Sequence, residues 1–329
     1  MATVGFGPLD LASIKINGNP LTQEYQDAII NMYIQRSIMG ASTVTLQLAD
    51  PYRKLLTSLV KQGATLELVN ADKPDTSFKY ILVQFMKASD QMQLVFESRA
   101  VYRLSHQTGQ LKVVGTDTTV FMQQMAGALG YRVVGPDYST IWPKITTKPI
   151  YKLNMSRGST ADPNENSWVA MNRLASSIGW RLWEDDEKIY FGPDEYWLGL
   201  VSGPGGTPGS PPINHAKGKS GKNMSVLKEF TNSIQLIDFD WDVGKPFGMA
   251  NVTCLLDGFD YHLGEVVKLD DSMGPASGYW LVYGIQRDLF NPQATLTLQA
   301  PMPIGAYIDP TSMPMKGLPL QPLNSSLLK

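Results

Sequence analysis

The chain has 329 residues, a formal net charge of −2 and an isoelectric point near 6.0, with 43% hydrophobic and 18% charged residues. This length allows two or three domains, each with its own core. The near-neutral balance excludes a bulk electrostatic attraction to nucleic acid or anionic membranes. The low charged fraction has two explanations of equal weight: a surface covered by other subunits, or a large β-rich core.

The sequence also argues against a secreted or membrane-inserted protein. Its first residues lack a basic region followed by an apolar core. No uninterrupted apolar run approaches the ~20 residues that span a bilayer. The single cysteine, Cys254, allows no internal disulfide and fits folding in a reducing cytoplasm. We therefore expect synthesis in the cytoplasm and no membrane insertion.

Residues 1–114 are predicted to form mostly strands. Residues 42–48 alternate cleanly, with Val44, Leu46 and Leu48 on one face, and residues 28–36 can pair with them through a turn. Asp50 and Pro51 are typical of a helix start, which predicts a short helix with an apolar stripe at residues 55–60. Further strands are expected at residues 64–69, 80–85 and 92–96.

In residues 115–200 the spacing of the apolar residues changes from the alternation of strands to that of amphipathic helices. An amphipathic helix is expected over residues 117–129, ending at Gly130. A second helix is predicted to start at an Asp162 cap, with Glu165 completing a capping box, and to stop at Gly179. Its apolar stripe and the following hairpin, residues 180–183 and 188–191 with a turn at residues 185–186, predict a small α+β module.

The remaining chain divides into a loop, a third folded region and a tail. Residues 201–221 are rich in Gly and Pro and cannot sustain a helix or a sheet. Short alternating strands at residues 234–241, 251–256, 281–287 and 294–299 predict a small barrel within residues 222–301. Residues 302–329 form a proline-rich tail that can lie extended on a neighbouring surface. The predicted fold class is mainly β with α+β: two small β-barrel domains flanking a small helix-hairpin α+β module.

No catalytic, cofactor or metal site is predicted. The three histidines, His106, His215 and His262, lie far apart without ligand spacing. The Gly218–Ser220 stretch lacks the first glycine of a phosphate-binding loop, because that position is Ile213. Cys254 alternates with apolar neighbours on a predicted strand, which favours a structural role over a nucleophile paired with His262.

Three features could bind a ligand or form an interface. The carboxylates at residues 184–187 are interpreted as a solvated hairpin turn. Most of the aromatic stretch, residues 168–197, is expected to be core, with Tyr196 and Trp197 as the members expected at the surface and able to stack on a ligand. The basic residues Lys217, Lys219 and Lys222 could contact DNA, although a solvated loop is favoured because exposed charges are screened.

Three segments, in this order, resemble the hub proteins of tailed-phage baseplates, also called minor tail or tail-associated proteins. Gly40 to Asp50 looks like the hub signature of a strand that ends in Asp. Residues 166–191 are similar to the helix-then-hairpin module of these hubs, which is LysM-like in outline. Residues 263–269, 278–290 and 295–298 resemble the closing barrel of hubs from phages of actinobacteria.

The resemblance implies a homotrimer in which two β domains per subunit make a ring of six barrels. Such a ring adapts a sixfold tail tube to threefold tip proteins and lines a channel for the tape measure protein and then for DNA. The implied partners are further copies of the chain, a distal tail or tube protein, the tape measure protein, and tip, spike or other baseplate proteins, with transient passage of DNA. The implied location is the tail tip of a virion.

The resemblance does not extend to catalysis. Many relatives continue into a peptidoglycan-cleaving domain, whereas this sequence ends at Lys329 without a nucleophile motif, so we expect no enzyme. The alternative hypothesis is a peptidoglycan- or carbohydrate-binding tail protein that acts through the LysM-like module. A cell-wall hydrolase ranks below both.

Overall fold

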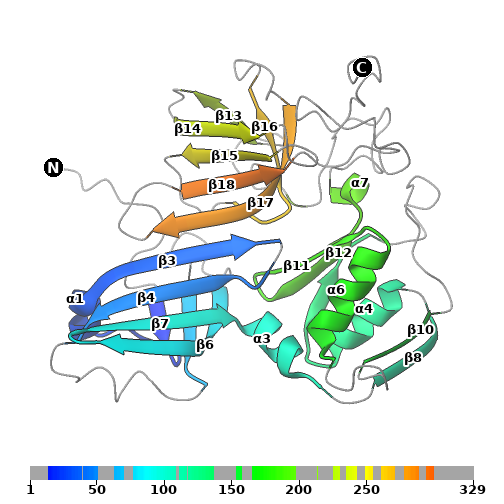
Figure 1. Ribbon diagram of the computed structural model, residues 1–329, viewed down its shortest axis with the longest axis horizontal. Helices are drawn as coiled ribbons and strands as arrows, with labels where there is room; N and C mark the ends of the chain where they lie inside the picture. The colour runs from blue at the N-terminus through cyan, green and yellow to red at the C-terminus, as the bar shows by residue number, and fades with distance from the viewer. Residues whose placement is uncertain are drawn as a thin grey trace.

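The computed structural model describes residues 14–38, 40–50, 63–69, 77–108, 111–116, 118–136, 153–157, 165–197, 213, 225–229, 235–242, 249–254, 261–270, 278–288 and 294–299. Two β domains and a helical module make up these parts (Figure 1). The predicted helix at Pro51, the tail and Lys217, Lys219 and Lys222 lie outside them. The β-rich fold class is confirmed.

The first β domain is a curled antiparallel sheet with a short helix at one end. Its strand order is β3-β4-β7-β6-β5-β1-β2. The strands are β1 (Ile14–Ile16), β2 (Asn19–Pro20), β3 (Ile29–Ser37), β4 (Thr43–Ala49), β5 (Thr65–Val69), β6 (Ser77–Ala88) and β7 (Gln91–Ser98), and α1 (Gln23–Ala28) precedes β3. Inward-facing residues of all the longer strands share one core, including Val44, Leu46 and Leu48 as predicted. Among the described strands β3 and β2 are not paired with each other, so closure of this domain into a barrel stays a prediction.

The second β domain is a closed barrel. Its strands are β13 (Ser225–Glu229), β14 (Gln235–Asp242), β15 (Met249–Cys254), β16 (Val266–Leu269), β17 (Gly278–Asp288) and β18 (Ala294–Gln299). They follow the order β16-β13-β14-β15-β18-β17, and pairing of β16 with β17 closes the ring. Each of the six strands is therefore paired on both sides. The small barrel predicted from the sequence is confirmed for the second domain.

The two β domains share one continuous sheet of 13 strands, because β17 also pairs with β3. The first residues of β17, Gly278–Leu281, pair with β16, whereas Gly284–Asp288 pair with Ser37–Tyr33 of β3. A register shift between Val282 and Gly284 lies where β17 passes from one partner to the other. The domains are thus joined by backbone hydrogen bonds as well as by side chains. Figure 1 shows β17 and β3 side by side where the two domains meet.

The helical module contains one three-stranded sheet and one two-stranded sheet. Its elements are α3 (Arg99–His106), β8 (Leu111–Thr116), α4 (Thr118–Gly127), β9 (Arg132–Val134), β10 (Leu153–Arg157), α6 (Ser167–Ser177), β11 (Arg181–Asp185), β12 (Lys188–Gly192) and α7 (Asp194–Trp197). Helices α3, α4 and α6 pack with the β11–β12 hairpin around one apolar core. The helix-then-hairpin arrangement predicted from the sequence is confirmed.

The start of α6 differs from the prediction. The helix begins at Ser167, and its cap is Asn166, whose Oδ1 accepts a hydrogen bond from the backbone N–H of Val169 at 2.9 Å. The predicted Asp162 cap is wrong. Glu165 therefore lies outside the helix, and it forms a bidentate ion pair with Arg173 instead of a capping box.

Candidate functional site

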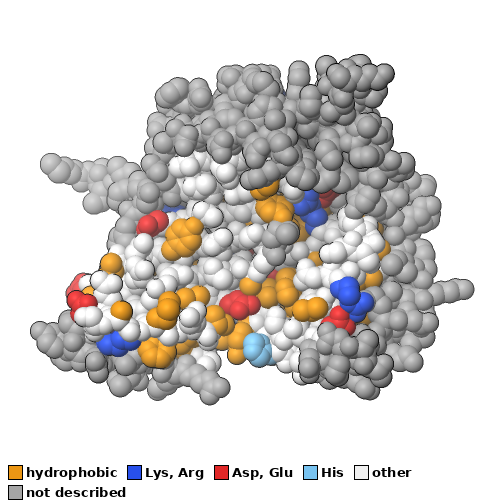
Figure 2. Space-filling view, viewed as in Figure 1, with side chains coloured by type: hydrophobic (Ala, Val, Ile, Leu, Met, Phe, Trp, Pro, Cys, Tyr) orange, Lys and Arg blue, Asp and Glu red, His pale blue; other side chains and the backbone are white. Residues whose placement is uncertain are grey.

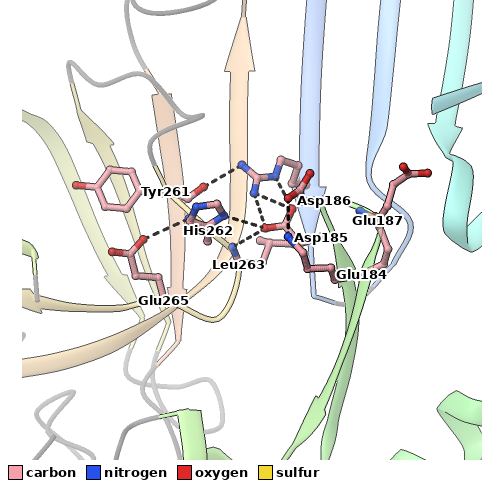
Figure 3. A network of polar contacts seen from close by, with 10 residues as sticks. Glu184, Asp185, Asp186, Glu187, Tyr261, His262, Leu263 and Glu265 are labelled. Atoms are coloured by element: carbon pink, nitrogen blue, oxygen red, sulfur yellow. Dashed lines mark hydrogen bonds and ion pairs between the residues drawn. The ribbon is translucent and has the colours of Figure 1, made fainter. Parts of the chain in front are cut away.

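The tip of the β11–β12 hairpin, residues 184–188, lies between the two β domains. Figure 3 shows its carboxylates facing β3 on one side and the segment from Tyr261 to Glu265 on the other. We call this meeting point the junction. It is a buried polar network that connects all three parts of the chain.

An ion pair between Arg36 of β3 and Asp185 of β11 forms the centre of the junction. Arg36 donates from Nε to Asp185 Oδ1 at 3.0 Å, and from Nη2 to Oδ1 at 2.7 Å and to Oδ2 at 2.6 Å. Both side chains are almost fully buried, with 1% and 2% exposed. Such planar, two-pronged pairing fixes the direction as well as the distance between two elements.

The same two residues also contact the second barrel. Arg36 Nη1 donates to the backbone carbonyl of Tyr261 at 2.9 Å, and the N–H of Leu263 donates to Asp185 Oδ2 at 3.3 Å. The imidazole Nδ1 of His262 lies 3.6 Å from Asp185 Oδ2. One ion pair thus connects the first β domain, the hairpin and the second barrel.

The backbone register explains why Arg36 points inward. Alternation along β3 puts Met32, Ile34 and Arg36 on the buried face. The guanidinium carbon of Arg36 lies 4.5 Å from the ring centroid of Phe78, a cation–π contact that helps to solvate the charge. A charged residue at an inward position of a strand was the signal in the sequence that could have revealed this site.

The charges of the central pair are stabilised by each other. Burial alone would lower the pKa of Arg36, but the charge of Asp185 raises it above its usual value. Burial would raise the pKa of Asp185, but the Arg36 charge and the contacts of His262 hold it at about 2. Both groups therefore stay charged at neutral pH.

The turn that follows Asp185 is held by further ion pairs. Asp186 and Glu187 have φ values of 51° and 56°, as in the tight hairpin turns that match the twist of two strands. Glu187 accepts a hydrogen bond from Arg99 Nε at 2.6 Å and lies 3.4 Å from Lys79 Nζ. Asp186 pairs with Lys188 at 2.8 Å. The hairpin tip is therefore attached to both β6 and α3.

An aromatic cluster fastens the base of the hairpin to the second barrel. Trp183 stacks on Tyr190 with ring centroids 5.1 Å apart and meets Trp197 edge-on at 4.7 Å. All three rings belong to the core of the second barrel, together with Trp280. At Gly264, where φ is +78°, a Cβ atom would lie 2.3 Å from the Trp183 ring. Only glycine fits there, because both the backbone angle and the space exclude a side chain.

A second ion pair supports this contact. Arg181 makes a bidentate pair with Asp194 of α7 through Nε and Nη2. Its Nη1 also donates to Gln299 Oε1 of β18 at 2.9 Å. The hairpin is therefore bound to the second barrel through Arg181 as well as through its aromatic residues.

Two expectations about these residues are wrong. Glu184 and Asp185 do not form a solvated turn, since they are 5% and 2% exposed. Trp197 is not at the surface: it is fully buried, and its Nε1 donates to the carbonyl of Gly192 at 3.0 Å. Tyr196 is half-buried, and burial raises its pKa. The aromatic platform expected at residues 196 and 197 therefore contributes mainly to packing.

Two of the three histidines, His106 and His262, lie in the described residues. The Nδ1 of His106 donates a hydrogen bond to the Tyr102 carbonyl at 2.8 Å, and His262 faces Asp185. Within the described ranges no group of three or more His, Cys, Asp or Glu residues has a metal-binding arrangement. None of the helices in this part of the chain is long and apolar enough to cross a bilayer. The contacts of the junction are hydrogen bonds and ion pairs that hold elements of the chain together.

Comparison with known proteins supports the resemblance at the level of fold. No family model and no curated protein sequence match the chain. A tail protein from Neisseria meningitidis matches with 14% identity and a TM-score of 0.55, over 87% of this chain and 95% of that one. The 43 kDa tail protein of prophage MuSo2 from Shewanella oneidensis matches with 10% identity and a TM-score of 0.53, over the same shares.

A third similar structure belongs to a secretion system. It is an Escherichia coli component of the type VI secretion system, described as similar to the T4 bacteriophage tail proteins gp27 and gp5. It matches with 10% identity and a TM-score of 0.58, over 87% of this chain and 76% of that one. At such low identity a match establishes the fold alone. The chain therefore has the fold of phage tail proteins and of their counterpart in the type VI secretion system.

Proposed function

We propose that this chain is a structural hub protein at the tip or baseplate of a phage tail, and that it acts as a homotrimeric ring. Three copies of a chain with two β domains would place six barrels around one axis. Such a ring would match a sixfold tube on one side and threefold tip proteins on the other.

The observation that carries the proposal is the rigid union of the two β domains. The β3–β17 pairing makes them one sheet, and the Arg36–Asp185 pair locks the hairpin against both. An adaptor that holds mismatched neighbours in register needs this rigidity, because a flexible linker would let each barrel move separately. The tail-protein fold over 87% of the chain supports the same reading.

A candidate surface for contact between copies lies on β6. Strand β5 pairs with β6 only as far as Ile81, and three large apolar residues follow: Val83, Phe85 and Met86, which are 41%, 44% and 44% exposed. Figure 2 shows hydrophobic side chains gathered over the lower left of the molecule, where β6 and β7 lie in Figure 1. Exposed apolar groups beside an unpaired strand edge mark an interaction surface.

The overall charge suits a channel for DNA. A net charge of −2 gives no strong attraction to the phosphate backbone, so a polyanion could pass without being held. The expected partners are a tube or distal tail protein, the tape measure protein, and tip or spike proteins. No cofactor or catalytic step is part of the proposal.

Size-exclusion chromatography with light scattering tests the oligomer. A mass near three times 36.3 kDa is expected, and electron micrographs of the same fraction should show threefold rings with a central hole. A chain that stays monomeric at high concentration, both alone and inside assembled virions, would refute the proposal.

A further inference from the structure

A carboxyl group without a cation lies inside the junction. Glu184 of β11 is 5% exposed, and it accepts a hydrogen bond from the backbone N–H of Glu187 at 2.9 Å. No lysine or arginine among the described residues forms an ion pair with it, although four cationic side chains lie around the hairpin tip. Burying an ionised carboxylate without a paired cation is costly.

The nearby cations are engaged elsewhere. Arg36 directs its guanidinium to Asp185 and to the Tyr261 carbonyl. The other three pair with the turn residues: Lys79 and Arg99 with Glu187, and Lys188 with Asp186. Each of these four cations thus forms its ion pair with a carboxylate of residues 185–187, and none of them forms one with Glu184.

The surroundings of Glu184 suit a neutral acid. It lines a small pocket between the hairpin tip and the first β domain, together with Ser42, Tyr80 and Ser98. The hydroxyl oxygens of Ser42 and Tyr80 are buried there without a hydrogen-bond partner, so neither of them donates to the Glu184 carboxyl. A neutral carboxyl costs less to bury than a carboxylate that lacks such hydrogen bonds.

We propose that Glu184 holds a proton in the folded junction, and that its ionisation weakens the docking of the hairpin tip on the first β domain. The contacts of the junction would then be stronger when Glu184 is protonated and weaker when it is ionised. This inference does not rest on the proposed hub function, because it concerns contacts within a single copy.

The electrostatics of the site agree with the geometry. Burial raises the pKa of Glu184 to about 8, and the neighbouring charge of Asp185 adds to this shift. The Ser98 hydroxyl, the N–H of Glu187 and the charge of Arg36 oppose the shift without cancelling it. The titratable and charged groups around Glu184 come from every adjoining element: Arg36 of β3, Lys79 and Tyr80 of β6, Arg99 of α3, Asp185, Asp186, Glu187 and Lys188 of the hairpin tip, and His262 and Glu265 of the second barrel.

The sign of the effect follows from proton binding. The pKa of Glu184 is higher in the folded chain than its ordinary value of 4.5, so the folded state holds a proton that the unfolded state has released. The stabilisation is complete below a pH of about 4.5, declines as pH rises to about 8, and is absent above that. His262 lies beside Asp185 in the same junction, so the test includes a variant that removes its imidazole.

Thermal unfolding of the full chain between pH 5 and 9 tests the inference. Glu184→Gln keeps the shape of the neutral acid without its titration, while His262→Gln and the surface change Glu24→Gln serve as controls. Wild type and both controls should lose several degrees in unfolding midpoint between pH 5 and 8.5. Glu184→Gln should lose much less and should unfold above wild type at pH 8.5. An undiminished loss in Glu184→Gln would overturn the inference.

Infrared spectroscopy supplies a second measurement in case Glu184→Gln does not fold. Burial also raises the pKa of Glu97, so the sample carries Glu97→Gln to remove that contribution. A carboxylic-acid C=O band should be present at pH 6.5 and vanish at pH 9.5 in the folded protein. Absence of the band at pH 6.5 would overturn the inference even if the protein forms trimers as proposed.

Discussion

Arg36 and Asp185 lie 149 positions apart in the sequence and form a buried, bidentate ion pair where three parts of the chain meet. The pair joins two parts of the chain that no local sequence motif could connect, since each residue comes from a different domain. Its value to the fold is specificity: a guanidinium and a carboxylate can satisfy each other there only when β3, the hairpin and the Tyr261–Leu263 segment are all in place.

Removing one partner of this pair should be strongly destabilising. Asp185→Ala leaves the Arg36 charge buried and uncompensated, which costs about 3–5 kcal/mol. Denaturant unfolding should show a loss of this size. Replacing both partners with apolar residues, Arg36→Met with Asp185→Leu, should recover much of it, because no buried charge remains.

The matched control for this change is an ion pair whose cation reaches solvent. Arg173, with 53% of its side chain exposed, pairs with the buried Glu165, so Glu165→Ala leaves a charge that water can solvate and should cost about 0–1 kcal/mol. Equal losses for Asp185→Ala and Glu165→Ala would contradict the assigned role of the junction.

Gly264 should not tolerate a side chain. Gly264→Ala places a Cβ 2.3 Å from the Trp183 ring at a φ of +78°, so the barrel loop and the hairpin base cannot both keep their positions. Gly63 has the same φ of +78° with open space around it, and Gly63→Ala should therefore cost only the backbone strain of about 1 kcal/mol. Gly264→Ala should cost clearly more in the same unfolding assay, and indistinguishable losses would exclude the proposed steric clash.

Acid should release the central ion pair at a low pH. The pKa of Asp185 falls from an ordinary 3.8 to about 2 in the folded chain. A lowered pKa contributes stability that is complete above a pH of about 4 and is lost as pH falls toward 2. Equilibrium unfolding followed by circular dichroism should show this loss in the wild type, and Asp185→Asn should show a smaller pH-dependence in this window. An unchanged acid profile in Asp185→Asn would contradict the prediction.

A charge on β6 should weaken the contact between copies. Phe85→Asp adds a carboxylate to the exposed apolar stretch of β6, and light scattering should show a shift from trimer to monomer with little change in unfolding temperature. Val169 of α6 is 47% exposed but lies in the helical module, so Val169→Asp should leave the mass unchanged. Trimers that persist in Phe85→Asp would exclude this surface as the interface.

The sequence predicted elements well where one physical pattern dominates. Val44, Leu46 and Leu48 face the core because the side-chain period of a strand is two. Gly179, with φ at +68°, follows α6 as a helix-ending glycine should. The hairpin of residues 181–192 and the closed second barrel were also predicted from alternation and turn residues.

The junction could not be predicted because it depends on distant partners. Four consecutive acidic residues in a turn are usually solvated. Arg36 and the Tyr261–Leu263 segment contact Asp185 or its partner, and the first β domain encloses Glu184, so distant parts of the chain bury both carboxyls. Trp197 was misplaced for the same reason: it follows the hairpin in sequence, but it packs into a core built mostly from β15 to β18. Asn166 caps α6 in place of the predicted Asp162. Both residue types cap helices well and they lie within five positions, so the sequence alone did not distinguish them.

Strand β17 restricts how one of the two β domains could be exchanged for another during evolution. One end of the strand completes the barrel through β16, and the other end extends the first sheet through β3. Neither half could be exchanged with a foreign domain unless the newcomer brought an edge of compatible register. Recombination among genes for this fold should therefore preserve this pair of halves together and vary the loops around them.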